Sequence, residues 1–360
     1  MVNLEPRLLN SKDKEWKEFL EMLPMKDVYF TPEYCSIWEE IYNMKSSCFI
    51  FGDHENFIFY PFLRRTINNL PFFKLVNNVK NTPVDIVTPE FYSGPLIKAE
   101  EKIKNLLLKK FLIEFHEWCI ENNVVAEFAR LHPFLKNHLL LPKENLTQVY
   151  ENSVLIDLQQ EKDVIWNNFE KRCRNAIKRA QREGIEVIRS ENKNDINDFH
   201  RIYIALMNRT KTTERYLHPK DFFEKFFEVM KENSSLFIAK YEGETIAGAL
   251  FLHGYGFMHY FRAASLENFQ SKNPNNLILF EAINWAKENK FKIFVLGGGT
   301  KLNDNLFNFK KSFSKTTINV RSYRKIHMSP VYNLLCKKKI EYDRINKLKT
   351  DVNYFPLYRG

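Results

Sequence analysis

Residues 235–265, SLFIAKYEGETIAGALFLHGYGFMHYFRAAS, decide the fold of the second half of the chain. Three runs of apolar, β-branched and aromatic residues are separated here by turn residues at Gly243 and Gly254. Such runs predict strands, and short glycine-containing connections predict that neighbouring strands are antiparallel. A predicted helix over 276–289 and a predicted strand over 291–299, FKIFVLGGG, come next. The stretch therefore predicts a helix-flanked, mostly antiparallel sheet.

The segments before this stretch continue the same alternation of helices and strands. The pattern predicts strands at 154–158 and 186–190 and helices at 161–183, 195–210 and 218–233. The first half of the chain runs in a similar order. Its apolar spacing predicts helices at 13–23, 32–44 and about 100–122, a hairpin at 48–67 and a strand at 124–131.

Two consecutive copies of a helix-flanked sheet fit a length of 360 residues, which favours two domains over a single core. The segment LLLPKENLTQVYEN, residues 139–152, is the predicted linker. We expect an α/β (α+β) chain with a first domain at 1–150, a second at 151–330 and a basic C-terminal tail at 331–360. Both domains should carry mixed, mostly antiparallel central sheets.

The overall charge predicts anionic partners. Lys and Arg total 54 against 44 Asp and Glu, a net charge of +10, and the sequence pI is about 9.1. The five cysteines are widely spaced and form no CxxC pattern, which argues against a zinc site and a secreted disulfide framework and predicts a reducing cytoplasm. No segment contains the roughly 18 apolar residues of a membrane span, so any membrane contact should be peripheral.

Residues 171–182, KRCRNAIKRAQR, contain six basic residues and no acidic one. On a helix Lys171, Arg174, Lys178 and Arg182 fall on one side, while the apolar residues occupy the other. The basic row is either a solvated face or a contact surface for an anion, which would relieve the repulsion between neighbouring cations.

Residues 305–314, NLFNFKKSFS, place two lysines among aromatic side chains. A helix capped by Asp304 puts Leu306, Phe309, Lys310 and Phe313 on one side and turns Lys311 away, whereas a strand would group Lys311 with the phenylalanines. The apolar spacing favours the helix. Lys310 is then partly desolvated and suited to stabilising an oxyanion, although a lysine extending out of a core helix has the same pattern.

The order of elements and several motifs resemble the Fem family of peptidoglycan-bridge aminoacyltransferases and its GNAT-like relatives. The second half carries the resemblance through RNAIKRAQREGIEV, YIALMNRTKTTERY, LFIAKYEGETIAGALFL, MHYFRAAS, NNLILFEAINWAKENKFKIFVLGGG and LFNFKKSF. The first half does so through YFTPEY, FYPFLRR, DIVTPEFYSGPL and EFARLHPFLKN. The sequence departs from the usual coenzyme A pattern, because residues 266–282 contain neither glycine of the pyrophosphate loop and Pro274 removes an amide donor. The resemblance is to compact members that lack a coiled-coil arm.

The resemblance implies two tandem GNAT-like domains that transfer an aminoacyl group from aminoacyl-tRNA to an amine of a nucleotide- or lipid-linked cell-wall precursor, with no tightly bound cofactor. It places Lys310 at the catalytic position of the family pattern FK(x)xF. The substrate-binding candidates are Arg64, Asp85, Tyr92, Arg174, Lys178, Arg209, Tyr216, Tyr260 and Phe309. Asp85 is also a candidate acid for the proton of the acceptor amine. No residue pattern predicts a metal site.

Two other functions fit the sequence. One is an acyl-CoA-dependent N-acyltransferase that acts on an amino sugar in surface polysaccharide synthesis. The other is a noncatalytic protein that binds an anionic glycolipid or RNA. In each case the basic tail, residues 331–360, either packs as a helix or rests on acidic lipid or tRNA at the inner face of the membrane.

Overall fold

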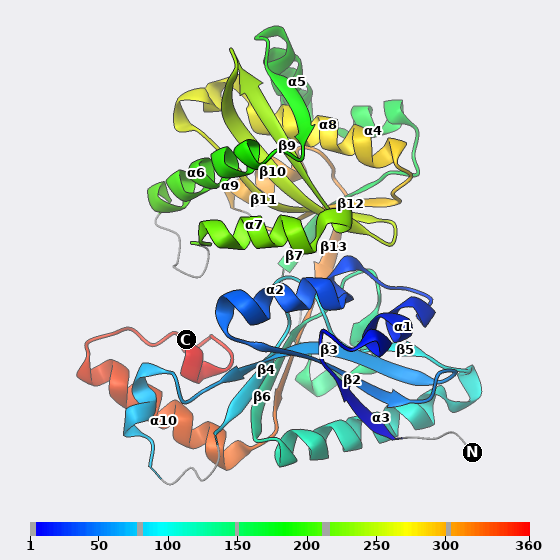
Figure 1. The fold of residues 1–360 in the computed structure, drawn as a ribbon, viewed down its shortest axis with the longest axis vertical. Helices are drawn as coiled ribbons and strands as arrows, with labels where there is room; N and C mark the ends of the chain where they lie inside the picture. The colour runs from blue at the N-terminus through cyan, green and yellow to red at the C-terminus, as the bar shows by residue number, and fades with distance from the viewer. Residues whose placement is uncertain (1–4, 78–81, 148–150, 211–216, 300–303) are drawn as a thin grey trace. The chain divides into compact units, whose positions relative to one another are not determined.

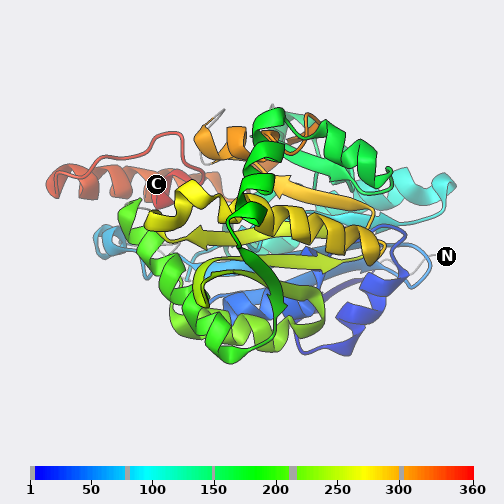
Figure 2. The same ribbon diagram turned by 90° about the horizontal axis from the view of Figure 1, so that it is seen from above.

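The computed structural model describes residues 5–77, 82–147, 151–210, 217–299 and 304–360 (Figures 1 and 2). The chain forms two compact units, Met1–Tyr150 with Val320–Gly360, and Glu151–Asn319. The second unit is therefore inserted into the sequence of the first. The expected boundary after residue 330 differs from this division, because the last segment packs within the first unit.

The first unit is built on one mixed sheet with the strand order β1-β2-β3-β4-β6-β14, in which β5 pairs with β3. All neighbouring strands are antiparallel except β4 and β6, which are parallel. The elements are β1 Pro6–Leu9, α1 Lys14–Met22, α2 Pro32–Tyr42, β2 Lys45–Gly52, β3 Phe57–Thr66, β4 Val84–Val87, β5 Leu96–Lys98, α3 Glu101–Glu121, β6 Val124–Arg130, β14 Ser322–Ile326 and α10 Ser329–Ile345.

Helices cover both faces of this sheet, which explains why β3 is a continuous apolar run. Phe59 meets Trp16 of α1 on one face, with 6.5 Å between the ring centroids. Tyr60, the next residue, points to the other face and meets Phe115 of α3 at 5.3 Å. Successive strand residues alternate between faces, so a strand covered on both sides needs apolar residues at every position.

The C-terminal segment completes the first unit. β14 pairs with β6 in antiparallel register, and α10 contributes Leu335 to a buried cluster with Phe72 and Val125. The predicted basic tail is thus a packed helix with a strand before it. Its lysines are largely neutralised on the helix itself, where Lys339 pairs with Asp343 and Lys338 with Glu341.

The second unit also contains one mixed sheet, in the order β13-β7-β12-β11-β10-β9-β8. Only β11 and β12 are parallel among the strand pairs whose register is described. The elements are β7 Glu151–Asp157, α4 Lys162–Asn168, α5 Lys171–Arg182, β8 Glu186–Ser190, α6 Lys193–Arg209, α7 Lys220–Val229, β9 Ser234–Tyr241, β10 Glu244–Gly254, β11 Phe257–Ser265, α8 Pro274–Glu288, β12 Ile293–Gly297, α9 Asn305–Lys311 and β13 Thr317–Val320.

Helices pack on both faces of the second sheet as well (Figure 1). Phe237 of β9 contacts Trp285 of α8 on one face. On the other face Phe199 of α6 lies so close to β10 that a Cβ at Gly248 would be 2.7 Å from Phe199 Cδ2 and 2.9 Å from Ile238 Cδ1. Figure 2 shows α5 crossing beside α8 on the Phe237 face.

The helix expected over residues 161–183 is interrupted. Phe169 has extended dihedral angles and is buried, with its ring 5.2 Å from that of Phe313. The side chain of Arg174 donates hydrogen bonds to the carbonyl oxygens of Asn167 and Phe169, which satisfies acceptors left open where α4 ends. The sequence pattern concealed this break, because both helices keep their apolar residues toward the same core.

Within the described residues, no helix is both long and apolar enough to cross a membrane.

Candidate active site

Lys310 lies near the end of α9, a short helix whose first turn is capped as the sequence predicts. The carboxylate of Asp304 accepts a hydrogen bond from the backbone N–H of Phe307 at 2.8 Å. Lys310 is only 8% exposed, whereas its neighbour Lys311 is exposed. The helix prediction is therefore confirmed. One detail differs: Phe307 is buried, and Leu306 is 39% exposed.

The ammonium of Lys310 is held between two strands of the second sheet. Its Nζ donates a hydrogen bond to the carbonyl oxygen of Gly298 at 2.6 Å and lies 5.7 Å from the ring centroid of Tyr260. Gly297 has a φ of +78°, and a Cβ there would be 3.4 Å from Nζ. Glycine thus provides both the left-handed backbone and the space beside the ammonium.

These contacts lie at the point where two parallel strands separate. β11 and β12 are paired from Phe257 with Ile293 to His259 with Val295, and the pairing then ends. Tyr260 is the next residue of β11, and Gly298 follows the end of β12. Lys310 therefore lies between the diverging strands, and burial raises the pKa of Tyr260, so its hydroxyl stays protonated at neutral pH.

Phe309 accompanies Lys310 as predicted. Its ring is half-buried and meets the edge of Phe313 at 5.6 Å. The structure thus brings Lys310 and Tyr260 of the predicted set together, with Phe309 beside Lys310 on α9.

The other predicted residues of the second unit have contacts of their own. Arg174 binds backbone carbonyls at the end of α4, and Arg209 forms an ion pair with Glu267 at 3.5 Å. Lys178 lies over the ring of Trp166 at 5.9 Å. Tyr216 falls outside the described residues. Neither Arg174 nor Arg209 has a described contact with Lys310 or Tyr260.

The candidates in the first unit are more deeply enclosed than expected. The carboxylate of Asp85 is completely buried and accepts hydrogen bonds from Arg65, at 2.7 Å, and from Arg359. Tyr92 is 1% exposed and packs against Arg130, whose guanidinium carbon is 5.1 Å from the ring centroid. These contacts favour structural roles over substrate contact or proton transfer.

Arg64 differs from these two residues. It is half-buried, and burial lowers the pKa of its guanidinium. Its Nε is buried without a hydrogen-bond partner among the described residues. An anionic ligand could accept a hydrogen bond from an unsatisfied donor of this kind.

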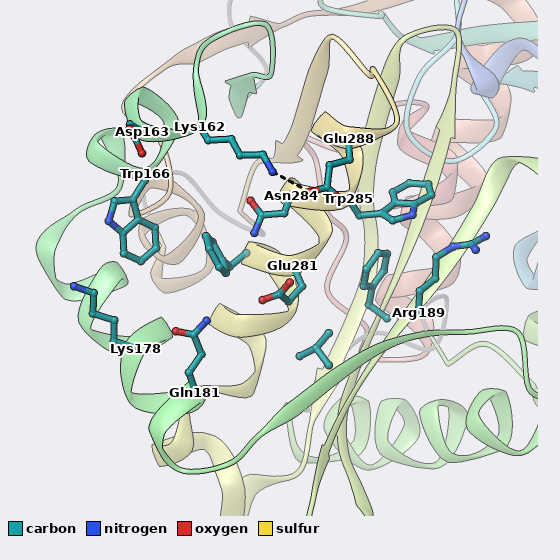
Figure 3. A pocket seen from close by; sticks show the side chains of 13 residues that line it. Lys162, Asp163, Trp166, Lys178, Gln181, Arg189, Glu281, Asn284, Trp285 and Glu288 are labelled. Atoms are coloured by element: carbon teal, nitrogen blue, oxygen red, sulfur yellow. Dashed lines mark hydrogen bonds and ion pairs between the residues drawn. The ribbon is translucent and has the colours of Figure 1, made fainter.

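A pocket of about 690 Å³ lies on the α8 face of the second sheet and was not predicted from the sequence (Figure 3). It is lined by α4, α5, α8, β8 and β9. The lining residues are Lys162, Asp163, Trp166, Lys178, Gln181, Val187, Arg189, Phe237, Phe280, Glu281, Asn284, Trp285 and Glu288. One signal was available: the residues of α8 that line it, from 280 to 288, alternate aromatic and polar types at helical spacing.

Comparisons with known proteins agree with this architecture. Residues 167–311 match the family model of the GNAT acetyltransferase domain. The UDP-N-acetylmuramoylpentapeptide-lysine N(6)-alanyltransferase of Weissella viridescens is 23% identical over 206 residues, which are 56% of this chain and 56% of that protein. The chain thus matches about half the length of this curated relative.

Two solved structures share the fold over most of the chain. The crystal structure of FemX aligns with a TM-score of 0.70 and 14% identity, covering 92% of this chain and 99% of FemX. A tandem GNAT protein from the clavulanic acid biosynthesis pathway aligns with a TM-score of 0.51 and 6% identity, covering 90% of this chain and 99% of that one.

The protein accordingly has two tandem GNAT-like domains, and the predicted fold class is confirmed. Within that class its fold is similar to that of FemX over most of the chain, and part of its sequence is similar to the Weissella alanyltransferase, in line with the resemblance of its motifs to the Fem family.

Proposed function

We propose that the protein transfers an aminoacyl group from aminoacyl-tRNA to an amine of a cell-envelope precursor. The observation that carries this proposal is the buried ammonium of Lys310 between the diverging strands β11 and β12. The match of residues 167–311 to the GNAT acetyltransferase domain and the similarity to the Weissella alanyltransferase support the reaction class.

In this reaction the acceptor nitrogen attacks the carbonyl carbon of the ester that links the amino acid to the ribose. The carbonyl oxygen becomes an oxyanion, the bond to the ribose oxygen breaks, and an amide forms. The amine loses a proton, and the departing ribose oxygen gains one. A fixed ammonium with little competing water stabilises both oxygens more than an exposed one does, which is the role proposed for Lys310.

The acceptor proposed is an amine of a nucleotide- or lipid-linked peptidoglycan precursor. The Weissella relative is named for transfer to the lysine of UDP-N-acetylmuramoylpentapeptide. A net charge of +10 favours both this anionic acceptor and a tRNA donor. A cytoplasmic location, with peripheral contact at the membrane for a lipid-linked acceptor, belongs to the same proposal.

A second candidate is an acyl-CoA-dependent N-acyltransferase, and the GNAT acetyltransferase match favours it. The start of α8 opposes it, since Pro274 occupies the first turn and follows Asn273, whose φ is +60°. This turn offers fewer amide donors to a pyrophosphate than a glycine-rich loop would.

The experiment follows radiolabelled amino acid from charged tRNA to UDP-N-acetylmuramoylpentapeptide, with parallel reactions that contain acetyl-CoA as the donor. We expect transfer from charged tRNA that is abolished when RNase is added first. Transfer that persists after RNase, or that requires acetyl-CoA, would instead support the second candidate.

Lys310→Ala should lower kcat/KM at least about 100-fold, because one preorganised oxyanion partner contributes on the order of 10²–10³ in rate. Lys311→Ala is the matched control, since Lys311 is adjacent and exposed, and its rate should change by no more than about twofold. An equal loss of kcat/KM in the two variants would show that Lys310 has no specific role in the reaction. Circular dichroism of both proteins checks that each variant keeps the overall secondary structure of the parent.

A further inference from the structure

The pocket between α5 and α8 has the size and lining of a small-molecule site. Its volume of about 690 Å³ lies within the roughly 300–1,000 Å³ typical of ligand pockets. None of its lining residues belongs to the cluster formed by Lys310, Tyr260 and Phe309. The pocket is thus separate from the candidate active site in the same unit.

Aromatic side chains form its walls. The rings of Trp166 and Phe280 meet edge to face at 5.2 Å, and Trp285 contacts Phe237 at 6.0 Å. In Figure 3 Trp166 and Trp285 lie on either side of Glu281. Trp166, Phe280 and Trp285 are half-exposed, whereas Phe237 is buried and Arg189 lies over the ring of Trp285 at 5.3 Å. Half-exposed aromatic rings can stack with a planar heterocycle.

Polar side chains without hydrogen-bond partners line the pocket beside these rings. Within the described part of the chain, the side chains of Lys178, Gln181, Glu281 and Asn284 make no hydrogen bond or ion pair. Glu281 is half-buried, and this burial raises the pKa of its carboxyl group. By contrast, Lys162 and Glu288 at the rim neutralise each other at 2.9 Å. The unpaired groups therefore have hydrogen-bonding capacity to offer a ligand.

We propose that this pocket binds a guanine nucleotide, either free or within single-stranded RNA. A carboxylate can only accept hydrogen bonds. Two adjacent N–H donors on one edge of a planar ring match its two oxygens. Guanine carries such an edge in its N1–H and N2 amino groups. Glu281 accepts these hydrogen bonds, Gln181 or Asn284 donates to O6, and Lys178 binds the phosphate.

The charge pattern distinguishes this ligand from a simple amine. An aromatic wall with a carboxylate could also hold an ammonium ion. Lys178, however, already places an ammonium over Trp166, and it would repel a second cation. A neutral base with an anionic phosphate satisfies both Glu281 and Lys178. The inference does not depend on the proposed aminoacyl transfer.

Tryptophan fluorescence measures this binding directly. Of the five tryptophans, only Trp166 and Trp285 lie in the second unit, and both line the pocket. GMP should quench the emission saturably, with a dissociation constant at least about tenfold lower than that of AMP, whose pairing edge lacks adjacent donors. A short RNA with one unpaired guanine, compared with its adenine counterpart, tests the RNA source. Tighter binding of the guanine RNA than of GMP would assign the site to RNA, and the reverse would assign it to the free nucleotide.

Two variants locate the interaction. Glu281→Gln should weaken GMP binding at least about tenfold and leave AMP binding unchanged. Lys178→Ala should weaken GMP binding but not guanosine binding, and Arg182→Ala, an exposed change on α5 outside the pocket, should affect neither. Equal affinity for GMP and AMP, quenching by choline in place of GMP, or unchanged GMP binding in both pocket variants would overturn the proposal. Calorimetric titration of Trp166→Phe confirms that binding continues when part of the optical signal is removed.

Discussion

Lys310 shows how much a single side chain depends on its immediate surroundings. The capped helix α9 fixes which of the two lysines faces inward, and Gly297 leaves the space that its ammonium occupies. The sequence predicted the helix and the inward lysine from the spacing of apolar residues. It could not predict the contacts with Gly298 and Tyr260, because these depend on where β11 and β12 diverge.

His253 makes the stability of the second unit sensitive to acid. It is buried near the end of β10, 3.0 Å from Ser235 Oγ and 5.4 Å from the ring of Trp285. Burial lowers its pKa from the usual 6.5 to about 4. Between these values the unfolded chain binds more protons than the folded one. The free energy of unfolding therefore falls as the pH drops from 6.5 to 4, by about 3 kcal/mol for this residue.

His253→Gln should remove this contribution. Urea unfolding at pH 7, 5.5 and 4, followed by tryptophan emission, should show a smaller acid-induced loss in the variant than in the parent. His54→Gln, an exposed change in the first unit, is the control and should leave the pH dependence intact. A parent-like pH dependence in the His253 variant would show that other groups cause the acid sensitivity.

Asp85 shows why residue types alone could not identify the substrate contacts. In the sequence Asp85 was a candidate substrate contact and a candidate acid for the proton of the acceptor amine. The structure places its carboxylate between Arg65 and Arg359, and these two arginines are separated by nearly the whole chain. A pairing of that kind is set by the fold of the first unit and leaves no local pattern in the sequence.

At the level of elements, Arg174 connects two helices that the sequence merged into one. Arg174→Ala should lower the free energy of unfolding by about 1–3 kcal/mol, because it leaves the carbonyls of Asn167 and Phe169 without their charged donor. Arg182→Ala on the same helix is the matched control and should change it by less than about 0.5 kcal/mol. Chemical denaturation measures both values. Equal stability of the two variants would show that the contacts of Arg174 contribute nothing.

The packing of α6 on the second sheet gives another prediction. Gly248→Ala should destabilise the protein by about 1–3 kcal/mol, because the new methyl group meets Phe199 and Ile238 at less than van der Waals distance. The melting temperature by calorimetry tests this. An unchanged melting temperature would mean that α6 moves away from β10 without cost.

Most elements could be predicted from periodicity and turn residues, since the local sequence contains that information. The helices at 32–44 and 100–122 and the three strands within 235–265 appear within a few residues of their expected bounds. The break at Phe169 and the strand β14 could not be predicted in this way. Both depend on partners distant in sequence, Phe313 for the first and β6 for the second.

At the scale of the whole molecule, the last segment is part of the first unit. Truncation after residue 330 removes nearly all of α10, which uncovers Phe72 and Val125, and leaves Asp85 with one arginine instead of two. Losing one partner of a buried ion pair alone costs about 3–5 kcal/mol. We expect amide protection in hydrogen exchange to fall across β2 and β3 while β9 and β10 keep theirs.

Arg359→Ala in the full-length chain separates the two effects. It retains α10 and removes only the second arginine, so protection in β2 and β3 should fall less than after truncation. Uniform loss of protection in both sheets would contradict the division into two compact units.

The insertion of Glu151–Asn319 within the first unit also affects how the protein is made. A ribosome delivers all of the inserted unit before it delivers β14 and α10, and domains generally fold as they emerge. The inserted unit can thus fold while the first unit is still incomplete, because β6 lacks its partner strand β14. Until β14 and α10 leave the exit tunnel, the nascent first unit exposes an unpaired strand edge and apolar side chains to which chaperones bind.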